Sequence, residues 1–194
     1  MDKLKIKVIL ASIRSNRFGD KPAYWITALA EQIPEFSVEL LDLKNYMLPM
    51  FAEVTSPAQV TGDYANPEVN KWAAKIAEAD GFIFVTPEYN HGYPSSLKNN
   101  LDYIYKEWNK KPMCVVSYGG TGGARVIEQL RTVCVELQIV SIRNSVNIMS
   151  PWNLVEMDGS LKAGVFDGYV KTAQNMLAQL SWWAKVLKEA RSKK

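Results

Sequence analysis

Residues that could bind an anion gather in the stretch ASIRSNRFGD, at positions 11–20. The stretch follows the apolar, β-branched run KIKVIL and precedes a helical pattern that starts at Pro22. Free backbone N–H groups and the positive end of a helix dipole favour an anion there, and serine hydroxyls and arginine forks fit phosphate oxygens. Because GxGxxG and Walker sequences are both missing, a terminal monophosphate fits better than a buried pyrophosphate. A capped helix with solvated arginines is the alternative. The candidate ligands are Ser12, Arg14, Ser15, Asn16 and Arg17.

A second stretch, TPEYNHGYPSSLKNN at 86–100, directly follows the apolar run FIFV. That run is short, β-branched and aromatic, which is typical of a strand buried on both faces. Proline, asparagine and glycine then force the backbone to turn. Tyr89 offers a flat aromatic face, and flanking prolines hold the backbone N–H groups in place, which suits a planar heterocycle with carbonyl edges. The alternative is a turn in which Tyr89 and Tyr93 only pack locally.

A third stretch, SYGGTGGAR at 117–125, also lies between a predicted strand and a predicted helix. Its glycines let the backbone come near a ligand because no Cβ stands in the way. These glycines are Gly119, Gly120, Gly122 and Gly123.

The elements around these stretches predict the fold. Apolar runs predict strands at 5–10, 36–41, 82–85, 113–116 and 139–142, the last continuing toward 146. Helical spacing predicts helices at 22–33, 67–79, 95–108, 124–137 and 169–187. Strands that alternate with helices indicate an α/β fold, a flavodoxin-like doubly wound five-stranded parallel sheet in the order 2-1-3-4-5 with helices on both faces. In this order the loops after strands one, three and four converge on one pocket.

Two regions have more than one interpretation. Ser95 and Ser96 are candidate caps of the third helix, and its apolar stripe fits either the core of this chain or a subunit contact. The irregular residues 42–66 could form a wall of the site, pack over the sheet or meet a second subunit. No repeat or linker divides the chain, so we expect one domain over 1–194. The stripe consists of Leu97, Leu101, Ile104 and Trp108.

Composition narrows the function classes. The chain has 194 residues and a net charge of +3, which is too balanced to argue for nucleic acid binding. Cys114 and Cys134 lie in apolar runs and suggest buried thiols in a reducing compartment. One histidine, His91, and two distant cysteines cannot build a standard zinc site, so we expect no metal. We find neither a membrane-spanning run nor a secretion signal, and expect the protein in the cytoplasm.

With these motifs in view, the sequence resembles the NAD(P)H-dependent FMN reductase family, which includes related quinone, azo-dye and chromate reductases of flavodoxin-like fold. PEYN followed by PxxLKNxxD is the most specific part of the resemblance. The family usually opens its first motif with Gly-Ser, whereas this chain has Ala11-Ser12 and keeps the serine donor. Family members are commonly homodimers or higher oligomers, which implies a homodimer or tetramer here.

The resemblance also implies roles for individual residues. The first loop, from Ser12 to Arg17, would bind the FMN phosphate. The residues that would cradle the isoalloxazine ring, largely through backbone groups, are Pro87, Glu88, Tyr89 and Asn90. Those that would close the pocket near the ring or the ribityl chain are Ser117, Gly119 and Gly120.

The implied chemistry is ping-pong transfer of hydride from NADPH or NADH to FMN and then to a quinone or similar small acceptor. The flavin carries the redox chemistry, and no protein nucleophile is required; His91 is only a weak catalytic candidate. An alternative is a flavin-bearing redox sensor that regulates a protein partner. A flavodoxin-type electron carrier is less compatible with the positive net charge. The central motif argues against a phosphosugar or nucleotide enzyme of the same fold.

Overall fold

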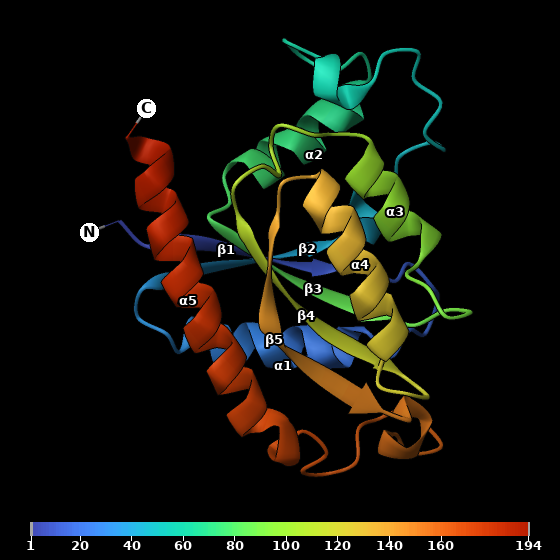
Figure 1. Ribbon diagram of the computed structural model, residues 1–194. Helices are drawn as coiled ribbons and strands as arrows, with labels where there is room; N and C mark the ends of the chain where they lie inside the picture. Colours follow the sequence, from blue (N-terminus) through green and yellow to red (C-terminus); the bar gives the residue numbers. More distant parts are fainter. Residues whose placement is uncertain (1, 194) are drawn as a thin grey trace.

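The computed structural model describes residues 2–193 and has a five-stranded parallel sheet with helices on both faces (Figure 1). The strand order is β2-β1-β3-β4-β5, which confirms the order expected from the sequence. Every neighbouring pair in the sheet is parallel. The strands are β1 (Leu4–Leu10), β2 (Phe36–Asp42), β3 (Gly81–Pro87), β4 (Pro112–Gly119) and β5 (Val140–Met149).

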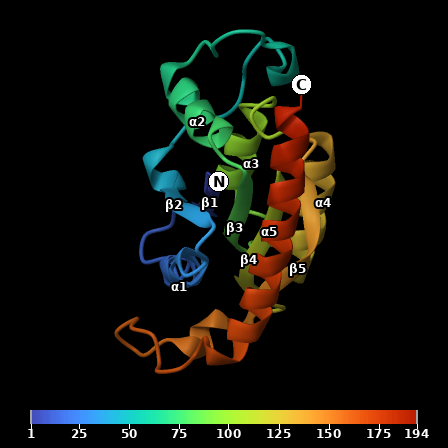
Figure 2. The same cartoon turned by 90° about the vertical axis from the view of Figure 1, so that its left-hand side faces the viewer.

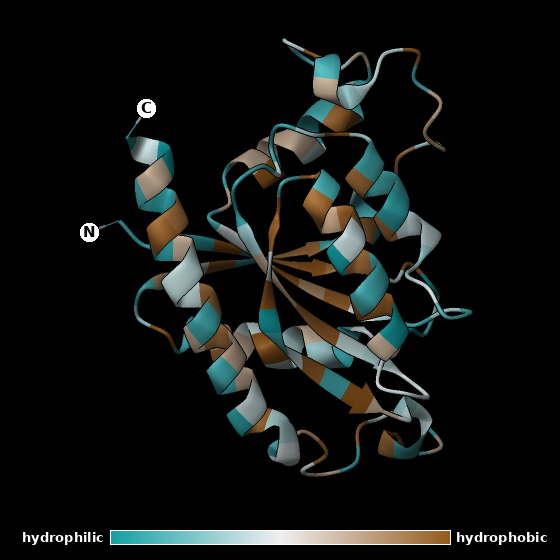
Figure 3. Cartoon of the chain, in the orientation of Figure 1, coloured by the Kyte–Doolittle hydropathy of each residue, from teal (hydrophilic) through white to brown (hydrophobic). Residues whose placement is uncertain are grey.

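Helices cover the sheet in two layers, and each layer encloses its own core. One core joins α1 and α5 to the sheet, and the other joins α2, α3 and α4 to the opposite face. All residues of β3 are buried, because this central strand is covered on both faces. The inner strands β1 and β3 are accordingly mainly hydrophobic (Figure 3). The helices are α1 (Asp20–Glu31), α2 (Pro67–Ala77), α3 (Ser95–Asp102), α4 (Ala124–Glu136) and α5 (Val170–Ser192).

The predicted helix at 95–108 is wrong in its second half, because α3 ends at Asp102. The backbone N–H of Tyr105 donates to the Tyr64 hydroxyl at 3.3 Å, so a tertiary contact replaces a helical one. Ile104 and Trp108 are nevertheless buried in the same core as the helix. Periodicity therefore identified the buried side chains but not the end of the helix.

The predicted serine caps of α3 are also wrong. Pro94 occupies the N-cap position, and no side chain caps the helix. The Ser96 hydroxyl instead donates to the carbonyl of Ala11 at 2.8 Å. This bond ties the start of α3 to the loop after β1, so the serine joins two of the predicted ligand loops.

The irregular region 42–66 packs on α3 within this chain. The side-chain oxygen of Asn99 accepts from the Phe51 N–H at 2.9 Å, and its amide donates to the Pro49 carbonyl at 2.7 Å. The Asn100 amide donates to the carbonyl of Tyr46 at 3.0 Å. Two adjacent asparagines of the central motif thus hold this region in place.

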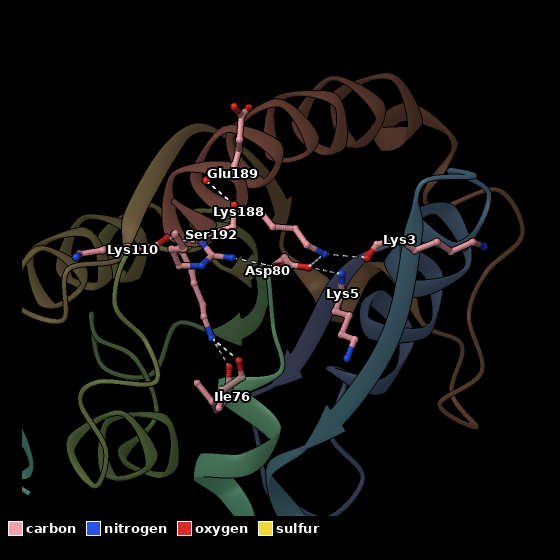
Figure 4. A network of polar contacts seen from close by, with 11 residues as sticks. Lys3, Lys5, Ile76, Asp80, Lys110, Lys188, Glu189 and Ser192 are labelled. Atoms are coloured by element: carbon pink, nitrogen blue, oxygen red, sulfur yellow. Dashed lines mark hydrogen bonds and ion pairs between the residues drawn. The ribbon is translucent and has the colours of Figure 1, made fainter. Parts of the chain in front are cut away.

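A charged network lies at the edge of the sheet where the strands begin (Figure 4). The Asp80 carboxylate accepts from Lys188 at 2.7 Å, from Arg191 at 2.9 Å and from the backbone N–H of Lys5 at 3.0 Å. The network joins the last turns of α5 to the beginnings of β1 and β3. Within residues 2–193, the helices are too short or too polar to cross a membrane.

Both cysteines, Cys114 and Cys134, are free thiols in the protein interior, as their apolar surroundings predicted. Burial raises the pKa of Cys134 to about 12 and raises that of Cys114 as well. Neither thiol is therefore poised to act as a nucleophile at neutral pH.

Candidate functional site

A cavity of about 850 Å³ opens at the C-terminal ends of the central strands. The loops after β1, β3 and β4 all line it, which confirms that these loops converge on one pocket. The predicted residues on its wall are Arg14, Asn16, Arg17, Pro87, Glu88, Tyr89, Gly119 and Gly120. The predicted residues outside its lining are Ser12, Ser15, Asn90 and Ser117.

The loop after β1 combines a buried serine with open backbone donors. Ser12 is fully buried, and its hydroxyl lies 2.8 Å from the hydroxyl of Tyr89, so it holds the loops after β1 and β3 together. Among residues 2–193, the N–H groups of Ser15, Asn16 and Phe18 donate to no backbone oxygen. Asn16 adopts the left-handed conformation with φ 50°. The loop can therefore offer backbone donors to an anion.

Arg17 lies on the cavity wall, but its charge is balanced by two carboxylates. Its guanidinium donates to Asp20 at 2.8 Å, to Asp42 at 2.7 Å and to the carbonyl of Ser12. The hydrogen bond to Asp42 is the largest of several effects that raise the pKa of Arg17. Arg14 is exposed and lies over the Tyr89 ring, with 5.7 Å between its guanidinium carbon and the ring centroid. Of the two arginines, Arg14 is the one free to meet a ligand.

The loop after β3 is a two-residue reverse turn. Tyr89 and Gly92 exchange backbone hydrogen bonds of 2.9 Å in both directions. Asn90 and His91 between them have φ values of 48° and 69°, as a type I′ turn requires. The amide of Gln129 from α4 donates to the His91 carbonyl at 2.9 Å. Asn90 and His91 thus shape a fixed turn beyond the lining of the cavity, with the Tyr89 side chain on its wall.

Glu88 fastens this turn to the start of α4. Its carboxylate accepts from the Arg125 side chain at 2.6 Å and from the Arg125 backbone N–H at 3.1 Å. Burial alone would raise the pKa of Glu88, but these bonds outweigh it and the pKa is lowered. Since its side chain is only 6% exposed, Glu88 is an anion held inside the wall.

The glycine loop after β4 packs too closely for larger residues. The Ser117 hydroxyl donates to the Gly122 carbonyl at 2.6 Å, and the Asn147 amide donates to Ser117 at 3.3 Å. Gly123 has φ 75°, and a Cβ added there would lie 2.5 Å from the Cβ of Ser117. Ser117 therefore orders the loop from behind, while Gly119 and Gly120 face the cavity.

The sequence reasoning missed part of the wall. Tyr118 lies between two predicted residues of the same motif, and burial raises the pKa of its hydroxyl. The segment 151–159 follows β5 and has no periodic pattern that could have revealed it. The additional lining residues are Phe18, Asp20, Lys21, Tyr118, Pro151, Trp152, Val155, Met157, Asp158 and Gly159.

Comparisons with known proteins agree with this geometry. Residues 4–153 match the family described as NADPH-dependent FMN reductase. An NAD(P)H-dependent FMN reductase of Schizosaccharomyces pombe is 44% identical over 129 residues, which are 66% of this chain and 64% of that relative. A 2-hydroxy-1,4-benzoquinone reductase of a Burkholderia species is 35% identical over 147 residues, covering 71% of this chain and 73% of that relative.

A solved structure supports the fold. FerB from Paracoccus denitrificans, a flavoenzyme NAD(P)H:(acceptor) oxidoreductase, superposes with a TM-score of 0.73 and 23% identity. The superposition covers 94% of this chain and 97% of FerB. At this identity the likeness concerns the fold, which is that of the flavodoxin-like sheet described above.

Proposed function

Because this chain belongs to the NADPH-dependent FMN reductase family, we propose that it is an FMN-dependent NAD(P)H oxidoreductase that reduces quinones or similar small acceptors. The observation that carries the proposal is the cavity of about 850 Å³, on which the three loops of the family motif converge. A cavity of that size accommodates a cofactor together with a small second substrate.

The residues around the cavity fit FMN at both of its ends. Open N–H groups of the loop after β1 and the free guanidinium of Arg14 suit a terminal phosphate. Gly119 and Gly120 line the cavity as a cradle without side chains. A Cβ at Gly119 would lie 3.1 Å from the Cβ of Glu88, so a larger residue there would crowd the wall. Tyr89 adds an aromatic wall to this cradle. When bound, FMN supplies the capacity to take hydride from a nicotinamide and to pass it on.

The remaining predicted residues order the loops of the wall or supply a backbone group in this proposal. Ser12 fixes Tyr89, and Ser117 fixes the glycine loop. Arg17 orders the first loop through its carboxylate partners. Ser15 contributes its backbone N–H, and Asn90 shapes the turn after Tyr89. We assign no catalytic role to His91, because it lies outside the lining of the cavity.

We also propose a homodimer in the cytoplasm. Two buried free thiols suit a reducing compartment. Three exposed apolar side chains, Met47, Met50 and Val54, lie on the segment packed against α3 and suit a contact with a second copy. Light scattering measures the molar mass of the purified protein, and a homodimer predicts the mass of two chains. Met50→Lys should shift that mass toward one chain.

Steady-state kinetics test the proposed reaction. Initial rates are measured with the FMN-loaded protein while NADPH and 1,4-benzoquinone are varied together. Alternate occupation of one site by donor and acceptor predicts parallel lines in double-reciprocal plots. Intersecting lines would contradict a site shared by donor and acceptor. A lack of NADPH oxidation in the presence of quinone would contradict the proposed oxidoreductase activity. NADH in parallel assays measures the preference between the two donors.

A further inference from the structure

The segment 150–161 forms a wall of the cavity that the three motif loops do not provide. It begins at Ser150, which has φ 45° and donates its backbone N–H to the Gly119 carbonyl at 2.9 Å. In Figure 2 this segment, in orange, projects below α1. The match to the family ends at residue 153, so most of the segment lies beyond it.

The segment holds its own shape through short-range hydrogen bonds. Val155 and Leu161 pair as an antiparallel bridge, and the Glu156 N–H donates to the Ser160 carbonyl at 2.9 Å. The Lys162 N–H donates to the Leu154 carbonyl at 3.0 Å, which closes the base of the hairpin. The hairpin can thus present side chains to the cavity in a fixed arrangement.

Trp152 is the large aromatic residue that this segment leaves exposed. Its side chain lines the cavity and is 62% exposed, although indole is among the most favourable groups to bury. Its Cη2 atom would lie 3.5 Å from a Cβ placed on Gly120, so the indole stands directly beside the glycine cradle. With FMN on the glycine cradle, as proposed above, a planar acceptor that lies against the flavin on the side of Trp152 would cover this exposed ring.

The two walls of the cavity differ in charge. One side is lined by three basic residues and one acidic residue of the loop after β1 and the start of α1, namely Arg14, Arg17, Lys21 and Asp20. The segment 150–161 contributes Pro151, Trp152, Val155 and Met157, which are apolar, and one acidic residue, Asp158. The cationic wall suits the FMN phosphate proposed above, whereas an uncharged planar ring suits the apolar wall.

We propose that Trp152 is a specificity-determining residue whose indole packs against the planar ring of an aromatic quinone acceptor. The inference rests on the proposed function and adds to it the class of acceptor, a quinone with an extended ring system. Exposed Met157, which lines the same cavity, supplies an adaptable apolar surface for rings of different size.

Binding and selectivity measurements test this role. The oxidised, FMN-loaded protein is titrated with 1,4-naphthoquinone by calorimetry without NADPH, so that no turnover occurs. Trp152→Ala is expected to weaken naphthoquinone binding by about 3- to 10-fold, as for loss of an aromatic pair. Trp152→Phe keeps an aromatic face and should retain most of the affinity. The matched control is Trp182→Ala, because Trp182 is 58% exposed on α5 and does not line the cavity.

Turnover separates the acceptor from the donor. In Trp152→Ala, the ratio of kcat/KM for naphthoquinone to that for ferricyanide, which has no planar ring, should fall by a similar factor. A loss confined to kcat/KM for NADPH, or equal behaviour of Trp152→Ala and Trp182→Ala, would overturn the assignment. If the wild-type protein reduces no quinone at all, the proposed function fails as well, so the two failures are distinguishable.

Discussion

Arg14 and Arg17 have the same residue type and nearly the same sequence position, yet the structure gives them different tasks. Arg17 is 9% exposed and bound by two carboxylates, whereas Arg14 is exposed beside Tyr89. The sequence placed both at the predicted phosphate loop, since composition and spacing reveal that a cation is present. The partner that balances Arg17, Asp42, lies at the end of another strand and could not be identified from spacing alone.

Exchanging each arginine for methionine should separate these tasks. Arg17→Met leaves Asp42 without its partner and should lower the free energy of unfolding by about 1.5–3 kcal/mol. Arg14→Met should leave stability nearly unchanged and weaken FMN binding by about 10-fold or more, since a charge-assisted hydrogen bond is lost. Urea denaturation and FMN titration measure the two effects. Equal stability of the two variants would contradict the role given to Arg17.

The Arg17–Asp42 pair also predicts a pH dependence of stability. Burial raises the pKa of Asp42, but the bonds from Arg17 and the Lys44 N–H outweigh it, and the pKa falls below its ordinary value of 3.8. The pair therefore contributes stability above pH 3.8, and this contribution is lost as the pH falls through the lower folded pKa. The stability difference between wild type and Asp42→Asn should be constant near neutral pH and shrink below about pH 4. If the stability difference between wild type and Asp42→Asn grew as the pH fell, the predicted direction of the pH dependence would be wrong.

At the scale of elements, hydrophobic periodicity predicted the strands better than the ends of helices, and the order of the strands followed from the choice of a flavodoxin-like fold. A run such as β3 is apolar because both faces are covered, and that signal is local. The end of α3 depends on Tyr64, a residue distant in sequence, whose hydroxyl accepts the Tyr105 N–H. The part of the segment 150–161 in the cavity wall was not predicted for a related reason. Its hydrogen bonds to Gly119 and within its own hairpin produce no periodic pattern in the sequence.

Asn99 should be the residue that keeps the region 42–66 on α3. Asn99→Ala would remove its bonds to Phe51 and Pro49 and leave those partly buried backbone groups without this partner. We expect a loss of about 1–3 kcal/mol of stability and faster proteolysis within 50–63. Limited proteolysis and urea denaturation measure both, with exposed Asn175→Ala on α5 as the control. Unchanged cleavage in Asn99→Ala would indicate that other contacts hold the region.

At the scale of the whole molecule, the two edges of the sheet have separate roles. The cavity lies where the strands end, and the Asp80 network lies where they begin. The predicted strand order was sufficient to bring the three ligand loops together, because parallel strands end at one edge. It could not reveal the Asp80 network, which depends on how the last turns of α5 pack.

The separation of the edges predicts that stability and ligand affinity can be changed independently. Asp80→Asn weakens the bonds to Lys188 and Arg191, and should lower the free energy of unfolding by about 1.5–3 kcal/mol. The Kd for FMN of the folded protein should stay within about 2-fold of wild type, since distant sites behave additively. Denaturation curves and FMN titrations of the same preparation provide both numbers. A large change in Kd would mean that the two edges are coupled.

An anaerobic FMN titration followed by visible absorption is the sharpest test of whether the cavity binds FMN and whether NADPH reduces it. The protein, freed of flavin, is titrated with FMN, and NADPH is then added in the absence of oxygen. We expect saturation at one FMN per chain, followed by loss of the flavin absorption band when NADPH is added. Flavin that binds but keeps its band with both NADPH and NADH would contradict the reductase. A protein that binds no FMN would contradict the assignment of the cavity itself.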